Sequence, residues 1–166
     1  SQDCSTRATF TTGGDPAVSI AGDVYVHPEY TAAGWLRKDL AFVHLDTPAY
    51  QVASDIQPIP VEERFRIPKQ GELLMLVGYG LTGPGCSQPS TGKMKLSLRV
   101  TDIGEDHIRF RYDNRHSCPG DSGGPVINQN GRVVGVASWT NSSDESTYRP
   151  THSNYDWIFS TPQSNR

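Results

Sequence analysis

Apolar and polar side chains alternate without a break over residues 93–100. Because successive side chains of a β-strand point to opposite faces of a sheet, this period of two predicts a strand with one buried and one solvated face. Residues 107–112 repeat the pattern. Shorter β-rich runs are also expected to be strands, at residues 23–27, 40–45, 73–77 and 131–139. The chain is therefore predicted to be all-β, with one short helix at residues 154–159.

Turn-forming residues separate these strands. The 166 residues include 16 glycines and 12 prolines, and residues 46–70 carry four of the prolines without a helical period. We expect that segment to be a long surface connection between two halves. Closely spaced strands with turn residues between them indicate an antiparallel barrel or sandwich in a single domain.

The charge pattern restricts the classes of partner. A net charge of −3 comes without a block of like charges, and no apolar run approaches the roughly 18 residues needed to cross a bilayer. We therefore expect no nucleic-acid partner and no membrane partner.

The start of the sequence and its cysteines carry two further expectations. No methionine, basic segment or apolar segment stands at Ser1, which predicts a start produced by a cut. The three cysteines are Cys4, Cys86 and Cys118. Because three is an odd number, a secreted form would hold one free thiol or one cysteine paired outside this chain.

A dinucleotide-binding motif has to be weighed at residues 78–83, which match G-x-G-x-x-G. In such a site the third glycine opens a helix whose N-terminus binds the pyrophosphate. Pro84, Gly85 and Pro89 follow here and prevent that helix. A glycine turn between strands is the better interpretation.

Residues 120–124 match the G-x-S-x-G elbow of α/β-hydrolases, with Asp144 and His152 following in the required order. The elbow must lead from a strand into a helix. Residues 125–127 are instead followed by a turn and another strand, so an esterase of that class is a weak alternative.

The nine residues 117–125, Ser-Cys-Pro-Gly-Asp-Ser-Gly-Gly-Pro, resemble the nucleophile signature of trypsin-like serine proteases. Other motifs of that family follow in order: an H-P-x-Y turn at 27–30, a D-L-A-L-like segment at 39–48, a glycine-aromatic-glycine turn at 78–80, a G-I-V-S-W-like strand at 135–139 and a Y-x-x-W-I helix at 155–158. The resemblance covers about residues 24–158. It implies two antiparallel β-barrels, the first incomplete, with the active site in the cleft between them.

The resemblance also implies roles for the site residues. Ser122 would attack the peptide carbonyl, and Asp39 would orient the imidazole that takes the Ser122 proton. The backbone N–H groups of Gly120 and Ser122 would form the oxyanion hole. Asp121 would form the activation ion pair with a newly cut N-terminal amine. The general-base histidine of the family lies upstream of the aspartate, which places it before Ser1.

The specificity pocket of the family would be built from His116, Ser117, Ser138, Trp139 and Thr140. His116 stands at the base, where enzymes with basic specificity have Asp. An imidazole there favours an acidic substrate side chain, whereas the alternative is that it only shapes a pocket for uncharged or aromatic residues. Thr140 replaces a glycine of the family and would narrow the pocket.

None of the remaining histidines is expected to replace the general base. They are assigned structural or surface positions: His27 in the H-P-x-Y turn, His44 in the strand after Asp39, and His107 and His152 on surfaces.

Cys118 corresponds to the family cysteine beside the nucleophile, but the usual partner is absent. Cys86 is the only candidate within the resembling region, so the resemblance implies a Cys86–Cys118 disulfide, with Cys4 paired upstream or free. No metal or organic cofactor is expected, because His and Cys occur at no ligand spacing.

The leading hypothesis is a secreted serine endopeptidase that acts on peptide or protein substrates. A protein inhibitor and an upstream segment that carries the histidine are the further partners expected. The chain would be one protease domain, with the remainder of the first barrel and the start of the linker at 1–60 and the second barrel and C-terminal helix at 61–166. The alternative is a non-catalytic homologue that acts as a binding module, which retention of Ser122, Asp39 and Gly120 argues against.

Overall fold

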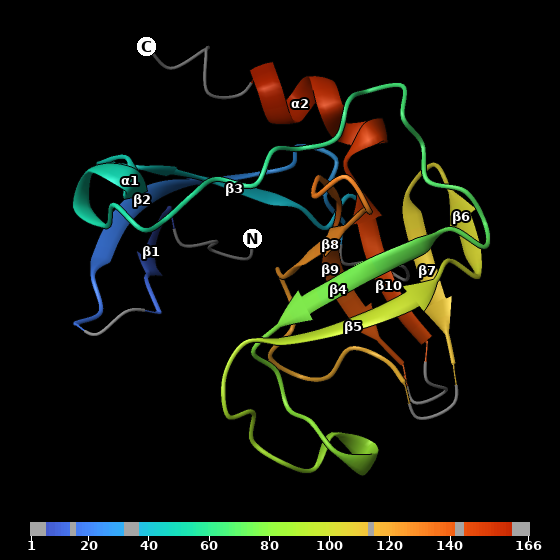
Figure 1. Cartoon of the computed structure of the whole chain (residues 1–166). Helices are drawn as coiled ribbons and strands as arrows, with labels where there is room; N and C mark the ends of the chain where they lie inside the picture. Colours follow the sequence, from blue (N-terminus) through green and yellow to red (C-terminus); the bar gives the residue numbers. More distant parts are fainter. Residues whose placement is uncertain (1–5, 14–15, 32–36, 113–114, 142–144, 161–166) are drawn as a thin grey trace.

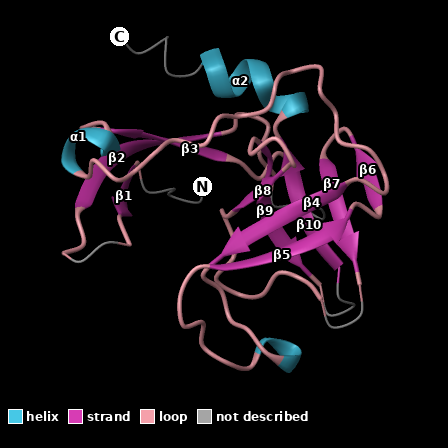
Figure 2. Cartoon of the chain, viewed as in Figure 1, coloured by secondary structure: helices cyan, strands magenta, loops and turns pink. Residues whose placement is uncertain are grey.

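The computed structural model describes residues 6–13, 16–31, 37–112, 115–141 and 145–160. These residues form two β-sheets, one of three strands and one of seven, with short helices at the periphery (Figure 1, Figure 2). Every pairing between neighbouring strands of these sheets is antiparallel. The predicted all-β class is confirmed.

The N-terminal sheet has the strand order β1-β2-β3. β1 (Arg7–Thr11) and β3 (Ala41–Leu45) pair with opposite sides of the central β2 (Ser19–Val26). No further strand of the described residues joins β1 to β3, so this sheet does not close into a barrel. A single helical turn, α1 (Ala49–Val52), follows β3.

The C-terminal sheet is curled and has the order β5-β4-β8-β9-β10-β7-β6 (Figure 1). Its strands are β4 (Leu73–Gly78), β5 (Met94–Arg99), β6 (Asp102–Gly104), β7 (His107–Arg111), β8 (Pro125–Ile127), β9 (Val133–Thr140) and β10 (Glu145–Pro150). A short 3₁₀ turn, η1 (Pro84–Cys86), lies in the loop between β4 and β5. A dinucleotide site would require an α-helix after Gly83, and this loop has only the short turn η1 there.

The connection between the sheets is fixed to the C-terminal sheet near its middle. Glu62 N–H donates to the Val133 carbonyl, and Val133 N–H donates to the Pro60 carbonyl, both at 2.9 Å. Phe65, a few residues further on, is 88 % exposed. The long surface connection expected from the prolines is therefore present, although its first part contains α1.

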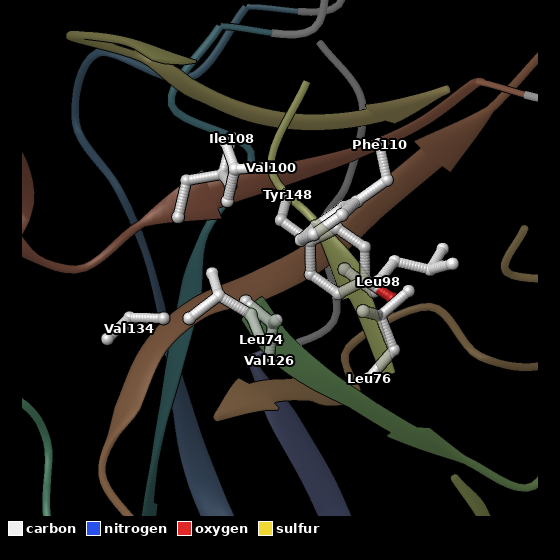
Figure 3. Close-up of a cluster of buried hydrophobic side chains, with 10 residues drawn as sticks. Leu74, Leu76, Leu98, Val100, Ile108, Phe110, Val126, Val134 and Tyr148 are labelled. Carbon is white, nitrogen blue, oxygen red and sulfur yellow. The ribbon is translucent and has the colours of Figure 1, made fainter. Parts of the chain in front are cut away.

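The hydrophobic core cluster lies within the C-terminal sheet and its turns (Figure 3), while Ile20 and Leu40 are buried outside it. Phe110 and Tyr148 meet edge to face at its centre, with ring centroids 5.6 Å apart. Burying a large apolar side chain contributes about 1.5–3 kcal/mol, so this cluster is the main source of stability. Its buried members are Leu74, Leu76, Leu98, Val100, Ile108, Phe110, Val126, Val134, Ala137 and Tyr148.

Strand β10 was not predicted from the sequence. All six of its residues are buried, yet the run Glu-Ser-Thr-Tyr-Arg-Pro is mostly polar and shows no apolar alternation. Some of its polar side chains find partners inside the protein: Glu145 forms an ion pair with Arg111, and Arg149 forms one with Asp106. β1 and β6 were also missed, because they are short and lie in polar segments.

The predicted C-terminal helix is confirmed as α2 (Tyr155–Ser160), which follows a 3₁₀ turn, η2 (His152–Asn154). The ring of Trp157 on α2 packs against His27 at the end of β2, with ring centroids 4.7 Å apart. The helix therefore connects the C-terminal sheet with the N-terminal one. Among the described residues, no helix has the length and apolar character required to span a membrane.

Candidate active site

Ser122 lies exposed in the glycine-rich loop that precedes β8. The backbone N–H groups of Gly120 and Ser122 donate to no acceptor among the described residues, and Ser122 Oγ has no hydrogen-bond partner there either. The other amides of the loop are occupied: Asp121 donates to Cys118 at 3.0 Å, Gly123 to Ala137 at 2.9 Å and Gly124 to Asp121 at 2.9 Å. The exposed Ser122 hydroxyl therefore lies near two unpaired backbone donors, its own N–H and that of Gly120.

The carboxylate of Asp121 holds this loop in place. Its Oδ1 accepts the Gly80 N–H and its Oδ2 accepts the Cys118 N–H, both at 2.8 Å. A Cβ atom would lie 1.9 Å from Oδ1 at Gly78 and 2.6 Å from it at Gly80, so only glycine permits the approach. The apparent dinucleotide motif is thus a cradle for a carboxylate. The expected ion pair of Asp121 with an N-terminal amine involves residues outside the described ones.

Gly120 requires its residue type for a different reason. Its φ of 96° lies in the region that disfavours side chains, and a Cβ would lie 2.9 Å from Gly80 Cα. The conformation that leaves the Gly120 N–H unpaired therefore depends on this glycine.

Asp39 lies in the turn that leads into the N-terminal sheet, and it is bound by Ser138 of β9 in the C-terminal sheet. Ser138 Oγ donates to Asp39 Oδ2 at 2.6 Å. Asp39 stands at the centre of a tight turn before β3, in which Leu40 N–H donates to the Lys38 carbonyl at 2.7 Å. Ser138 also lines a cavity together with Ser122, so it contacts one predicted catalytic residue and shares a cavity wall with the other.

That cavity, of about 370 Å³, brings together all five residues predicted to bind substrate. Hydrogen bonds join the hydroxyl groups that lie in its wall and directly behind it. Ser117 Oγ lies 2.7 Å from Thr140 Oγ1 and donates to the buried Ser146 Oγ at 2.9 Å. The lining residues are Gly85, Cys86, His116, Ser117, Cys118, Pro119, Ser122, Ala137, Ser138, Trp139, Thr140 and Asn141.

Sequence reasoning missed Ser146 and Tyr148, which stand on β10 behind this cavity. Ser146 is opposite Thr140 in the pairing of β10 with β9, so only the strand register reveals its position. Tyr148 is buried, and burial raises the pKa of its phenol. Neither residue belongs to a motif that could have identified it.

His116 lies in the cavity wall beside a disulfide. The Cys86–Cys118 bridge expected from the sequence is present. His116 Nδ1 is 2.8 Å from the Ser117 carbonyl oxygen and 3.9 Å from Cys86 Sγ. Donor atoms of Cys86, His116 and Cys118 lie within 4.8 Å of one another. In the disulfide the sulfurs are not thiolates, the form of cysteine that binds metals.

The other histidines have different surroundings. His27 is buried, and its Nδ1 accepts the Glu29 N–H at 3.1 Å. His107 is partly buried and pairs with Asp102 at 2.9 Å, His44 is exposed on β3, and His152 is only partly exposed. Burial lowers the pKa of both His27 and His152, with Lys38 adding to the effect. None of these four has a hydrogen bond to Ser122 or Asp39.

A second and larger cavity, of about 730 Å³, adjoins Ser122 on the side of β4 and β5. Apolar side chains from three segments line it, among them Ile59, Tyr79 and Met94, together with Lys93. This surface was not predicted from the sequence, because its residues belong to no common motif.

An exposed serine beside two free backbone amides, its own and that of Gly120, and an aspartate bound by Ser138 of β9 are features that a serine-hydrolase site requires, and here they lie on an all-β scaffold. The chain belongs to the trypsin family, because the family model described as Trypsin matches residues 5–158.

Individual relatives agree with this assignment. The chain is 33% identical to serine protease 7 of Drosophila melanogaster over 61% of its length and 30% of that protein. It is 26% identical to trypsin of Xenopus laevis, with 86% of this chain and 63% of that protein covered. It is likewise 26% identical to kallikrein-15 of Saguinus oedipus, with 82% and 61% covered. The chain thus spans less than two thirds of the length of these relatives.

A solved structure named "Structure of GrC" superimposes with a TM-score of 0.79 at 18% identity, covering 92% of this chain and 73% of that one. At this identity the likeness concerns the fold. The predicted trypsin-like fold class is confirmed.

Proposed function

We propose that this chain carries the nucleophile half of a serine endopeptidase, which hydrolyses peptide bonds through an acyl-enzyme on Ser122. The observation that supports this most directly is the pair of unpaired N–H groups on Gly120 and Ser122, on either side of the occupied Asp121 amide. Such donors stabilise the oxyanion that forms when a serine attacks a carbonyl, and loss of one costs about 10²–10³ in rate.

The general base is proposed to come from a histidine upstream of this sequence. Within the described residues, neither Ser122 nor Asp39 has a hydrogen bond to any histidine, and Asp39 has only the bond from Ser138. Asp39 would then accept the N–H of the incoming imidazole, fix its tautomer and stabilise its charged form. The imidazole would take the Ser122 proton and later donate it to the leaving amine.

The 370 Å³ cavity is proposed as the pocket for the substrate side chain on the acyl side of the scissile bond. Its described lining contains no Asp or Glu, so a buried Lys or Arg side chain would lack a counter-charge. His116 is the ionisable lining residue that favours an acidic side chain. The alternative is that His116 only shapes a pocket for uncharged or aromatic side chains, with the hydroxyl groups of Ser117 and Thr140 in its wall.

Asp121 is proposed to respond to activation. A separate cavity of about 220 Å³ is lined by Asp121 together with Leu81, Thr82 and His116. A cationic amine that entered it would find a carboxylate already oriented by two backbone amides. This loop would then be stabilised by the ion pair expected from the family resemblance.

We also propose that the protein is secreted. The Cys86–Cys118 bridge supports it, because disulfides persist in oxidising compartments. The substrates would be peptides or proteins, and a protein inhibitor would bind to the same cleft.

The experiment compares this chain with its longer form, produced with the sequence that precedes Ser1 in its gene. A fluorophosphonate probe should label the longer form at Ser122, as located by peptide mass spectrometry, and label this chain slowly or not at all. Ser122→Ala should abolish labelling in both. Robust peptide hydrolysis by this chain alone would show that the base has been misassigned. A longer form that binds peptides without labelling or turnover would establish the non-catalytic binding module instead.

A peptide panel with the longer form tests the pocket. Cleavage after Asp or Glu that weakens in His116→Gln would support the acidic assignment. Cleavage after uncharged or aromatic residues would support the alternative, and preference for Lys or Arg would overturn both.

A further inference from the structure

Two carboxylates and two cations from distant parts of the chain meet behind the candidate active site. Arg149 on β10 is 5 % exposed, and Lys38 in the turn before β3 is 8 % exposed. The side chain of Asp106, in the β6–β7 turn, is 21 % exposed, and Asp39 is half-buried. Buried charges persist when opposite charges and hydrogen bonds compensate them. These four formal charges sum to zero.

Arg149 donates to two neighbours directly. Nη1 donates to the Asp106 carbonyl at 2.6 Å and to Asp106 Oδ2 at 3.2 Å, while Nε donates to Ser138 Oγ at 3.3 Å. A hydroxyl has one hydrogen, and Ser138 gives it to Asp39 Oδ2 at 2.6 Å. The bonds therefore run in one direction, from the guanidinium through the hydroxyl to the carboxylate.

The backbone that carries Asp39 is restrained by the same cluster. Lys38 N–H donates to Asp106 Oδ2 at 3.4 Å, and Lys38 Nζ lies 4.0 Å from Asp106 Oδ1. Lys38 also has a φ of 48°, an uncommon conformation for a residue with a side chain. Asp106 thus binds Arg149 and at the same time fixes the turn on which Asp39 stands.

Other titratable groups surround the cluster and belong in any interpretation of its pH behaviour. Burial lowers the pKa of Arg149, while the carboxylates of Asp106 and Asp39 oppose that effect and Arg109 adds to it. A guanidinium nevertheless stays charged in proteins. The imidazoles near Lys38 are those of His27 and His152.

We propose that Arg149 is a positioning residue for Asp39. Through Ser138 it fixes one carboxylate oxygen of Asp39, and through Asp106 it fixes the turn on which Asp39 stands. A neutral side chain at this position would remove the donor to Ser138 and leave Lys38 as the cation beside Asp106. The catalytic meaning of this arrangement rests on the proposed function. The charge and hydrogen-bond arrangement does not depend on it.

The first test needs no enzymatic activity. Carboxyl ¹³C NMR of this chain at pH 7, with aspartate labelled and Asp39 assigned through Asp39→Asn, reports how the Asp39 carboxylate is held. In Arg149→Met the Asp39 resonance should shift and broaden, because the donor to Ser138 is lost, and in Arg149→Lys, which keeps a donor and a charge, it should change less. The exposed Arg99→Met on β5 should leave it unchanged. A folded Arg149→Met protein whose Asp39 resonance matches that of wild type would overturn the proposal.

A second variant covers the case in which Arg149→Met does not fold. Ser138→Ala removes one oxygen and interrupts the path from Arg149 to Asp39. If Ser138 transmits the effect, Arg149→Lys should change the Asp39 carboxyl resonance less in the Ser138→Ala background than in wild type. Equal changes in the two backgrounds would show that Ser138 transmits nothing and would overturn the proposal.

The third test uses the longer form that contains the upstream segment. Arg149→Lys should lower kcat by about tenfold or more and leave KM nearly unchanged, because the substrate pocket is not altered. An unchanged kcat in an active wild-type background would contradict the positioning role. An inactive wild-type enzyme would refute the proposed function alone, since the NMR result stands separately.

Discussion

Ser138 Oγ lies 2.6 Å from Asp39 Oδ2, although 99 positions of sequence separate the two residues. One belongs to the C-terminal sheet and the other to the turn that leads into the N-terminal sheet. This hydrogen bond therefore joins the two halves beside the candidate catalytic residue Asp39, in addition to the Lys38–Asp106 and His27–Trp157 contacts.

The glycine cradle around Asp121 gives a prediction about stability. Gly80→Ala places a Cβ 2.6 Å from Asp121 Oδ1, so the carboxylate must move and its bonds to Gly80 and Cys118 are lost. We expect a loss of about 2 kcal/mol in the free energy of unfolding, measured by urea denaturation. Gly92→Ala is the matched control, because nothing lies within 4 Å of its added Cβ. Equal midpoints for the two variants would contradict the role of Asp121.

The disulfide closes a loop with a sequence separation of 32 residues. The double variant Cys86→Ser with Cys118→Ser should lose about 3 to 4 kcal/mol of stability, because its unfolded chain is less restricted. Urea denaturation without reductant measures the difference, and wild type with reductant should approach the variant. Peptide mapping of unreduced protein provides the check: an alkylated Cys118 in native material would refute the bridge.

Two phenylalanines distinguish the core from the surface. Phe110 is fully buried against Tyr148, so Phe110→Ala should cost about 3–5 kcal/mol. Phe65 is 88 % exposed and contacts the Arg64 guanidinium, so Phe65→Ala should cost less than about 1 kcal/mol. Thermal unfolding of both variants tests the contrast. Similar losses would mean that residues 53–72 pack more closely than described.

The buried imidazoles predict how stability depends on pH. Burial lowers the pKa of His27 and His152 below 6.5, the value expected in the unfolded chain. On acidification through about pH 6.5 the unfolded chain binds protons that the folded protein does not. The free energy of unfolding should therefore be fully present above this range and fall as the pH approaches the lower folded-state values.

His27→Phe, which keeps a ring against Trp157, should lose less stability between pH 7 and pH 5 than wild type does. His44→Gln, at an exposed site on β3, should follow the wild-type curve. Denaturation midpoints at several pH values measure the slopes. A His27→Phe curve parallel to that of wild type would assign the acid sensitivity to other groups.

The sequence allowed the fold class and much of the site to be predicted because local patterns reflect local structure. Alternation predicted β5 and β7, and a short motif located Ser122 with its glycines. The bond from Ser138 to Asp39 could not be derived in this way. It depends on how two distant segments are placed by the whole fold.

Strand β10 shows most clearly what the sequence patterns could not predict. Its buried residues are polar, so a pattern of apolar side chains could not reveal it. Ser146 and Arg149 both stand on it: Ser146 accepts a hydrogen bond from Ser117 in the loop before Ser122, and Arg149 donates one to Ser138 on β9. Buried polar side chains are specified by their partners, and those partners lie elsewhere in the sequence.

Because the core cluster lies in the C-terminal sheet, the two parts of the candidate site depend on different parts of the fold. Of the apolar residues in the N-terminal strands, Ile20 is buried, whereas Phe10, Val26 and Val43 remain exposed. We therefore expect the C-terminal sheet to collapse around its own side chains and to form the Ser122 loop without Asp39. A variant in which the N-terminal sheet unfolds should then lose the proposed activity and keep this loop.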